Sequence, residues 1–308
     1  MTYKRIHNQE LSIIIEQTEN NSCLLYDESK DIYNEIKNLL DKKFPNQFKF
    51  RIQEKVGIDF FIKKMIKNEN FTFVKYGDGE LLCMIGVDGK NCDDHPYSLE
   101  LKKLLEISFV KLLRFYDDVF LADWEDNLVK TRSSYLNVNN LSPKFADYDS
   151  FLTIKENIND EKLLNFYKLL KQSDRKKILV GPKKLEPTIE MLDIDHFVEV
   201  PITNAFSEYK NISSLINDIG VQDDSIYILC CSMMSCLICS DLKEKNTNIT
   251  ILDVGSGLDP IFSIKTRPNQ PDESECFRYF SSILPKNYRS KKTINALNQL
   301  NMSISNFK

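Results

Sequence analysis

The second half of the chain carries short, continuously apolar runs that alternate with helical patterns. Ser225–Cys231 reads SIYILCC, and Ile249–Val254 reads ITILDV. Strands that helices cover on both faces of a sheet have such runs, whereas half-exposed strands alternate apolar with polar residues. Because a helical pattern separates each run from the next, right-handed crossovers can join them as parallel neighbours. The sequence therefore predicts an α/β fold with a doubly wound, mostly parallel Rossmann-like sheet and helices on both faces.

The expected elements of this half follow one another without long gaps. The strands are 177–181, 197–200, 225–231 and 249–254, and the helices are 160–172, 185–192, 208–219 and 233–243. Residues 1–56 are expected to form an N-terminal helical extension with a helix over 32–40, and residues 268–308 a C-terminal helical tail. The α/β domain is expected to span 57–267, with the polar stretch 130–154 as a long loop over its site.

One stretch of the first half, Phe71–Gly86, joins two apolar runs through Gly77-Asp78-Gly79-Glu80. We interpret it as a buried strand, a glycine-hinged loop and the first turns of a helix. An Asp-Gly pair between apolar runs is also typical of a β-hairpin. The second run, Leu81–Ile85, does not alternate as a half-buried hairpin strand does. The strand–loop–helix interpretation places two carboxylates at the carboxyl end of a strand, where open α/β sheets bind ligands.

Asp78 and Glu80 are one residue apart on this expected tight loop. Both can direct oxygen atoms at one hard cation, and Mg²⁺ and Mn²⁺ prefer oxygen ligands completed by water and substrate phosphates. Gly77 and Gly79 permit backbone angles that other residues avoid, and they let a diphosphate approach the main chain. The stretch therefore predicts a Mn²⁺ or Mg²⁺ site beside a phosphate. The Asp-rich segment Val87–Pro96 is interpreted as a solvated turn.

The segment Lys75-Tyr-Gly-Asp-Gly-Glu80, followed by two leucines, resembles the Arg-[Phe/Tyr]-Gly-Asp-Gly-Glu signature of the GT-D-type glycosyltransferases. Further matches follow in the family's order: Val180-Gly-Pro182, Val200-Pro-x-x-Asn-Ala-Phe206 and Asp253-Val-Gly-Ser-Gly-Leu-Asp259. The resemblance covers about Gly57 to Arg267. It departs at Lys75, where the family has Arg. Lysine offers positive charge to a phosphate but lacks the planar bidentate fork of arginine.

The resemblance implies a metal-dependent glycosyltransferase. It would move a hexose from a nucleoside diphosphate sugar, UDP-glucose or a related UDP-sugar, to an acceptor hydroxyl on a glycan or glycoconjugate. Asp78 and Glu80 would hold the metal. The donor would be bound by Lys75, Tyr76, Gly77, Gly79, Asn204, Ser232 and Arg267. If the transfer inverts at the anomeric carbon, a carboxylate must take the acceptor proton; Asp259 is the first expectation and Asp253 the second, because both lie on the facing loop.

Several of these side chains also have structural interpretations. Ser232 precedes a helix whose amino end offers N–H groups to a phosphate, and it also suits a simple N-cap. Asn204 suits a hydrogen bond to ribose, base or sugar, and equally a turn before a helix. Trp124 at a strand end could stack on a sugar or base, or lie in the core. Lys265 and Arg267 could steady the charge of a leaving diphosphate.

Two other functions remain open. Ile251–Gly257 also resembles motif I of the Rossmann-type methyltransferases, which bind S-adenosylmethionine. Only about fifty residues follow it, a third glycine is missing where Leu258 and Asp259 stand, and Asp78 and Glu80 would have no role. A non-catalytic module that binds a nucleotide sugar is the second alternative.

Composition excludes some partners. The net charge is -4 and the pI near 5.6, so no overall attraction to nucleic acid is expected. No run of about eighteen apolar residues and no signal-peptide core is found, so we expect a cytoplasmic protein without an integral membrane segment. The eight cysteines are expected to be reduced, with Cys236 and Cys239 as core residues. Assembly into a homodimer stays open.

Overall fold

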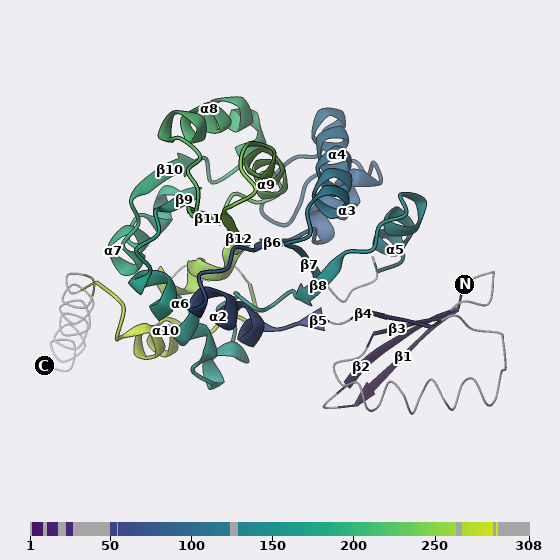
Figure 1. Ribbon diagram of the computed structural model, residues 1–308, viewed down its shortest axis with the longest axis horizontal. Coiled ribbons are helices and arrows are strands. Elements are labelled where there is room, and N and C mark those ends of the chain that lie inside the picture. Colours follow the sequence, from purple (N-terminus) through teal and green to yellow (C-terminus); the bar gives the residue numbers. More distant parts are fainter. Residues whose placement is uncertain are drawn as a thin grey trace, which may run out of the picture.

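The computed structural model describes residues 2–8, 11–17, 23–26, 50–53, 55–123, 129–262, 267–285 and 288. Eight strands form one sheet in the order β10-β9-β11-β12-β6-β7-β8-β5. All seven neighbouring pairs in this sheet are parallel. Figure 1 shows the sheet running across the body of the protein with helices on both sides. The predicted α/β fold with a doubly wound parallel sheet is confirmed.

The strands of this sheet are short. They are β5 (Lys55–Val56), β6 (Thr72–Val74), β7 (Val119–Asp123), β8 (Lys144–Asp147), β9 (Lys177–Pro182), β10 (His196–Val200), β11 (Ile226–Leu229) and β12 (Thr250–Asp253). Every residue of β6, β7, β9, β11 and β12 is buried, which explains their continuous apolar runs. The chain runs from β6 to β7 and β8 on one side, and β9 to β12 fill the other. The winding therefore reverses beside β6, the place where such sheets bind ligands.

Two layers of helices cover the sheet. One layer holds α3 (Asp78–Met84), α4 (Leu99–Phe115), α8 (Tyr209–Ile219) and α9 (Met234–Lys245), and the other α2 (Ile58–Ile66), α6 (Lys162–Gln172), α7 (Thr188–Leu192) and α10 (Glu273–Phe280) (Figure 1). Successive strand residues enter opposite cores: Tyr227 and Leu229 pack in the first, and Ile228 packs in the second. This alternation is the two-residue period of a strand, and it requires apolar side chains on both faces.

Helix ends follow from local sequence. Ser98 caps α4, and its hydroxyl accepts a hydrogen bond from the Leu101 N–H at 3.1 Å. Asp272 and Glu275 form a capping box at the start of α10, with reciprocal bonds of 2.9 and 2.8 Å. Gly220 ends α8 with a φ of +80°, a backbone angle that favours glycine.

The stretch 130–154 differs from the long loop that the sequence predicts. It contains most of α5 (Val129–Val138) and the whole of β8. In β8, Phe145 and Ala146 are buried, Lys144 is exposed and Asp147 is half-buried. Strand β8 reads only KFAD, too short to show a periodic pattern, and the surrounding Asn and Pro residues indicate a loop. Its parallel pairing with β7 and β5 comes from tertiary packing.

The described part of residues 1–56 is β structure rather than the expected helical extension. Strands β1 (Thr2–Asn8), β2 (Leu11–Gln17), β3 (Cys23–Tyr26) and β4 (Phe50–Gln53) form a second sheet in the order β1-β2-β3-β4. The β-branched run Ile13-Ile14-Ile15 in β2 favours a strand. The helix predicted over 32–40 lies outside the described residues.

The α/β unit also extends beyond both predicted limits. It begins at Lys55, because β5 belongs to the large sheet. At the other end, Phe280, Ile283 and Leu284 are at most 5% exposed and pack in the second core. The expected C-terminal tail therefore contributes α10 and its following turn to this unit, while 286–287 and 289–308 lie outside the described residues.

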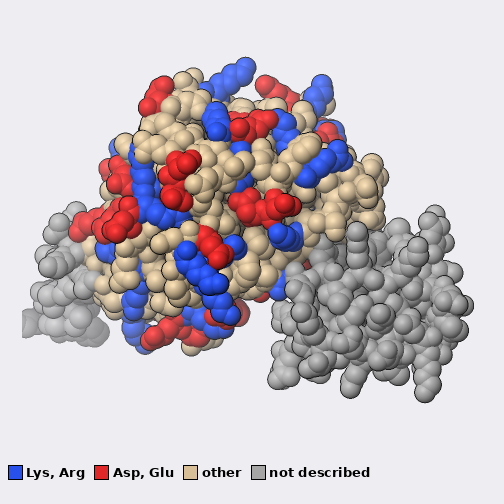
Figure 2. All heavy atoms as spheres, in the orientation of Figure 1, with Lys and Arg blue, Asp and Glu red and all other residues tan. Residues whose placement is uncertain are grey.

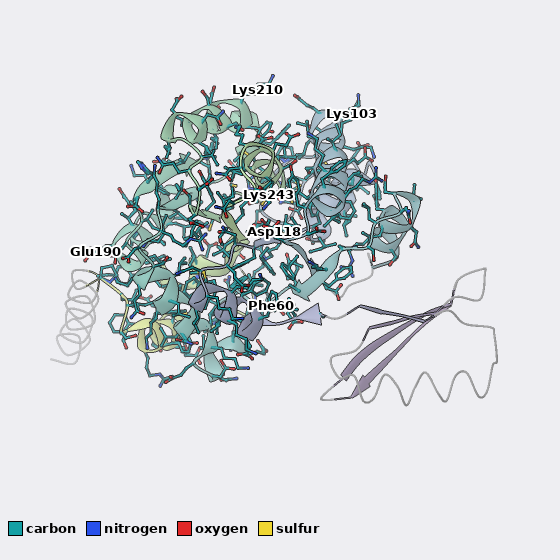
Figure 3. All side chains as sticks on the ribbon, viewed as in Figure 1. Phe60, Lys103, Asp118, Glu190, Lys210 and Lys243 are labelled. Carbon is teal, nitrogen blue, oxygen red and sulfur yellow. The ribbon has the colours of Figure 1, made fainter. Side chains whose placement is uncertain are left out.

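A buried ion pair ties α9 to the amino edge of the sheet. The Lys243 ammonium is fully buried and donates to Asp118 Oδ2 at 2.6 Å and to the Thr247 carbonyl at 2.9 Å (Figure 3). A buried ammonium is tolerated only with such partners. This pair lies just before β7, at the edge where the strands start and away from their carboxyl ends.

The surface and the helices bear on the predicted partners. Figure 2 shows basic and acidic side chains interspersed on the visible face of the described residues. Within the described ranges, none of the helices combines the length and the apolar character needed to cross a bilayer. Cys83, Cys92, Cys230, Cys231, Cys236, Cys239 and Cys276 are free thiols, and Cys236 and Cys239 are buried core residues as predicted.

Candidate functional site

A cavity of about 840 Å³ lies at the carboxyl edge of the sheet. Its walls come from the segments that follow β6, β7, β8, β11 and β12, together with residues 91–93, 267 and 269. Carboxylates dominate its polar lining: Asp78, Glu80, Asp93, Asp123, Asp147, Asp149 and Asp253. The basic side chains in the same lining are Lys55, Lys75 and Arg267.

The Gly77–Glu80 segment joins β6 to α3, as the sequence predicts. Asp78 and Glu80 are the first and third residues of α3. Glu80 Oε2 accepts the Gly77 N–H at 2.9 Å, and Asp78 Oδ1 accepts the Gly79 N–H at 2.8 Å. Each carboxylate thus uses one oxygen to bind the helix amino terminus, where negative charge is favoured. The second oxygen of each remains for a ligand.

The electrostatics of this pair suit a cation. Burial raises the pKa of Glu80 to about 8, and the nearby Asp253 and Asp78 charges act in the same direction against its own and the Gly77 N–H groups. A divalent ion would remove this repulsion. Two carboxylates leave most positions of a Mg²⁺ or Mn²⁺ ion to water and phosphate, as those ions require. Among the described residues, no group of three or more His, Cys, Asp or Glu side chains is arranged to hold a metal ion.

Asp253 ends β12 and supports the neighbouring β6 loop. It is 4% exposed, and its Oδ2 accepts the Lys75 N–H at 3.2 Å. Burial raises the pKa of Asp253 to about 6, while the Lys75 charge and backbone N–H groups lower it. Its carboxylate therefore has a structural role that is independent of any ligand.

Lys75 lines the cavity and is 7% exposed. Its ammonium lies 4.2 Å from the centroid of the Tyr148 ring, a cation–π contact. Burial lowers the pKa of Lys75, and the charges of Asp253, Asp149 and Glu80 oppose that shift. A cation surrounded by carboxylates at this depth can also face a phosphate.

Protein atoms fill the space beside two glycines of the loop that resembles the methyltransferase motif. A Cβ at Gly255, whose φ is +53°, would lie 3.3 Å from Lys75 Nζ. A Cβ at Gly257 would lie only 2.5 Å from the Phe151 carbonyl oxygen. The absent side chains therefore make room for Lys75 and for the segment after β8, rather than for a cofactor. The loop continues into a 3₁₀ helix, η4 (Gly255–Phe262).

The wall after β7 and β8 carries charged side chains of both signs. Asp123 and Asp147 are paired in register at the ends of these strands. Arg132, which is 2% exposed, forms a buried ion pair with Asp123. Lys55 Nζ lies 2.8 Å from Asp147 Oδ1 and 3.8 Å from Asp123 Oδ2. Among the described residues, two carboxylates and two cations therefore lie side by side in this wall.

Ser232 and Arg267 are also brought to the cavity, as predicted. Ser232 has a φ of +53°, and its hydroxyl accepts a hydrogen bond from Asn91 Nδ2 at 2.9 Å. Arg267 donates to both Asp93 oxygens at 2.9 Å and lies 3.2 Å from the Cys92 sulfur. The segment predicted as a solvated turn, 87–96, thus contributes residues 91–93 to the cavity wall.

Four predicted site residues, Tyr76, Gly77, Asn204 and Asp259, are not brought to the cavity lining. Tyr76 is fully buried, and its hydroxyl lies 2.7 Å from Ser108 Oγ in the core. Asn204 is exposed and occupies the N-cap position of the short helix η3 (Ala205–Glu208) with a φ of +50° and no side-chain capping hydrogen bond. Asp259, the first expectation for a base, points elsewhere: its Oδ2 lies 3.0 Å from Lys184 Nζ in a partly buried ion pair. Gly77 contributes its N–H to Glu80, whereas Gly79 lines the cavity.

Sequence reasoning missed the contributions of Lys55, Asp147 and Asp149. All three depend on β5 and β8, two edge strands too short to detect from periodicity. The available signal was Asp147-Tyr-Asp149 directly after the apolar Phe145-Ala146 pair. Trp124 and Lys265, two further candidates, lie outside the described residues.

Solved structures have a similar fold at low sequence identity. One, described as a new glycosyltransferase (DUF1792) from Streptococcus sanguinis, aligns with a TM-score of 0.50 and 16% identity over 73% of this chain and 85% of that chain. Another, described as the highly conserved domain of unknown function 1792 with a distinct glycosyltransferase fold, aligns with a TM-score of 0.47 and 18% identity over 66% and 78%. No protein-family model matches this chain, and no curated protein matches it significantly. The similarity supports the fold, and residue roles have to be argued from the site itself.

Proposed function

We propose that this protein is a metal-dependent glycosyltransferase that moves a hexose from a nucleoside diphosphate sugar, such as UDP-glucose, to an acceptor hydroxyl of a glycan or glycoconjugate. The observation that carries the proposal is the Asp78–Glu80 pair at the amino end of α3. Both carboxylates line a large polar cavity beside the strand where the sheet reverses its winding. The similar fold of a structure described as a glycosyltransferase agrees with it.

Asp78 and Glu80 would hold Mn²⁺ or Mg²⁺ through their remaining oxygens. When bound, such an ion neutralises charge on the diphosphate. Lys75 lines the same cavity and is suited to a phosphate oxygen by its charge. The N–H groups near Ser232 and the guanidinium of Arg267 are further donors at the rim, so an anionic donor meets positive charge from several sides.

The methyltransferase alternative receives less support. Its glycine loop would have to leave room for a cofactor, but Lys75 and Phe151 fill the space beside Gly255 and Gly257. The methyltransferase interpretation would also leave Asp78 and Glu80 without a function.

Calorimetric titration of UDP and UDP-glucose into the full-length protein tests the proposal. Titrations are run without metal and with Mg²⁺ or Mn²⁺, on the wild type and on Asp78→Ala. Nucleotide binding that requires the metal and is lost in Asp78→Ala is expected. A matched control is Asp193→Ala, which removes a carboxylate 61% exposed on the surface and should bind as the wild type does.

Absence of nucleotide binding with every metal would reject the donor assignment, and binding of S-adenosylmethionine instead would favour the methyltransferase. Metal-dependent binding of UDP-glucose without any release of UDP in the presence of simple glycosides would favour a binding module. Release of UDP that depends on an acceptor would establish transfer.

A further inference from the structure

The seven carboxylates of the cavity differ in what they bind. Six are engaged by described groups: Asp78 by the Gly79 N–H, Glu80 by the Gly77 N–H, Asp93 by Arg267, Asp123 by Arg132, Asp147 by Lys55 and Asp253 by the Lys75 N–H. Asp149 is the exception. Among the described residues, its carboxylate has no hydrogen-bond donor and no cation within 4 Å. It is also exposed, although it lines the cavity.

The backbone of Asp149 is nevertheless firmly held. Its carbonyl accepts the Leu152 N–H at 3.0 Å and the Asn157 side-chain amide at 2.6 Å. The next residues pass over Gly257, where only a glycine admits the Phe151 carbonyl. A carboxylate that is positioned by its backbone and has free lone pairs is suited to accept a proton, because no existing bond has to break.

The surroundings of Asp149 suit an acceptor hydroxyl. It follows β8 by two residues, close in the chain to the ion-paired side chains of Lys55, Asp123, Asp147 and Arg132. Side chains of both signs offer donors and acceptors to hydroxyl groups. Burial by neighbouring segments raises the pKa of Asp149, and the Lys75 and Lys55 charges oppose that rise.

We propose that Asp149 is the catalytic base of the transfer, an inference that rests on the proposed function. Its carboxylate takes the proton of the acceptor hydroxyl while that oxygen forms a bond to the anomeric carbon of the donor. The bond between that carbon and the diphosphate oxygen breaks, and its electron pair leaves with the nucleoside diphosphate. The products are an inverted glycoside, the nucleoside diphosphate and a protonated Asp149, which returns its proton to solvent.

The two carboxylates expected from the sequence fit this role less well. Asp259 is outside the cavity lining and paired with Lys184. Asp253 reaches the cavity, but it is 4% exposed and its oxygen holds the Lys75 N–H. Protonation of Asp253 during each turnover would weaken the bond that ties β6 to β12.

The test compares Asp149→Asn with Asp147→Asn, two changes that each remove one cavity carboxylate two residues apart. UDP release from UDP-glucose is measured with Mg²⁺ and with the most active of a set of simple methyl glycosides, from acid to alkaline pH. Asp149→Asn is expected to lower kcat by about a hundredfold or more and to abolish the acid limb of the kcat profile. Its affinity for UDP should stay within about twofold of wild type, because the proposed metal ligands are Asp78 and Glu80 and not Asp149. Asp147→Asn should keep the acid limb.

A kcat for Asp149→Asn within about fivefold of wild type, with its acid limb intact, would overturn the inference, as would retention of anomeric configuration in the product seen by proton NMR. Asp149→Ser serves as a second variant if the first does not fold. Absence of UDP binding by the wild type would instead reject the proposed function. Failure of the proposed function can therefore be distinguished from failure of the assignment of Asp149 as base.

Discussion

The backbone N–H of Lys75 donates to the Asp253 carboxylate at 3.2 Å, joining the ends of two adjacent strands that are 178 residues apart in sequence. The same lysine extends its ammonium over Gly255, just beyond Asp253, and onto the Tyr148 ring. One residue thus contacts the segments after β12 and β8 while its own segment carries Asp78 and Glu80. The position of the proposed metal pair therefore depends on tertiary contacts of Lys75 as well as on the local helix.

Replacement of Gly257 by alanine tests whether the segment after β8 is held by close packing. The added Cβ would lie 2.5 Å from the Phe151 carbonyl oxygen, so the backbone must move. We expect Gly257→Ala to lower the free energy of unfolding by about 1–3 kcal/mol, the usual range for overpacking. Urea denaturation measures this loss. The UDP-glucose turnover should fall as well, because the displaced segment carries Asp149.

Gly57→Ala is the matched control for this substitution. Its Cβ would lie 3.1 Å from Asp147 Oδ2, the end of a side chain that can rotate away, and its backbone is extended. A smaller loss of stability is therefore expected. Equal losses in the two variants would contradict the packing argument.

The pH dependence of stability should report on His95. This side chain is buried, and its Nδ1 accepts the Ala205 N–H at 3.2 Å, which requires a neutral ring. Burial lowers the pKa of His95 below its ordinary 6.5, although Asp93, Asp94 and the Ile202 carbonyl oppose the shift. Below pH 6.5 the unfolded chain binds more protons than the folded chain, so this group makes folding less favourable as the pH falls.

The measurement is the difference in unfolding free energy between wild type and His95→Gln, whose side-chain oxygen can still accept the N–H. The wild type should lose stability relative to the variant between about pH 7 and pH 5, the range that begins above the ordinary histidine pKa. A constant difference over that range would show that His95 does not titrate differently on folding.

Competition for the Arg267 guanidinium is a further prediction. Arg267 holds both oxygens of Asp93 at 2.9 Å, so a diphosphate has to share or displace that carboxylate. Asp93→Asn should tighten UDP binding by about five- to tenfold, which corresponds to about 1–1.4 kcal/mol. Arg267→Gln should weaken it by a similar factor. Calorimetry with Mg²⁺ at two salt concentrations measures both, and weaker binding in Asp93→Asn would mean that Arg267 only positions the loop.

The sheet could be predicted from sequence where its strands are buried on both faces. Strands β9, β11 and β12 have only buried residues and sit between parallel neighbours, so their apolar runs report the fold directly. Strand β8 could not, because it has four residues and ends in Asp147. Its identity as a strand depends on pairing with β7, which is information that the local sequence does not contain.

The residues of the candidate site, like the strands of the sheet, could be predicted only in part. Asp78 and Glu80 could be located because Gly77 and Gly79, which flank Asp78, mark the change from strand to helix. Asp259, which the sequence predicts at the site, lies outside the cavity lining. The 3₁₀ helix η4 turns its carboxylate toward Lys184. Periodicity does not predict such a turn, and Asp149 was hidden with the strand that carries it.

The placement of β6 between β12 and β7 has a consequence for how the specificity of such a protein can change. Backbone pairing on both sides anchors the segment that carries Asp78 and Glu80. Residues 91–93 and five residues of the segment 148–157 reach the cavity from outside the strands: Tyr148, Asp149, Ser150, Leu152 and Asn157. Insertions or exchanges in those loops can reshape the substrate pocket while the central carboxylates stay in place. An engineer seeking a new acceptor would vary these two loops and leave β6, α3 and β12 untouched.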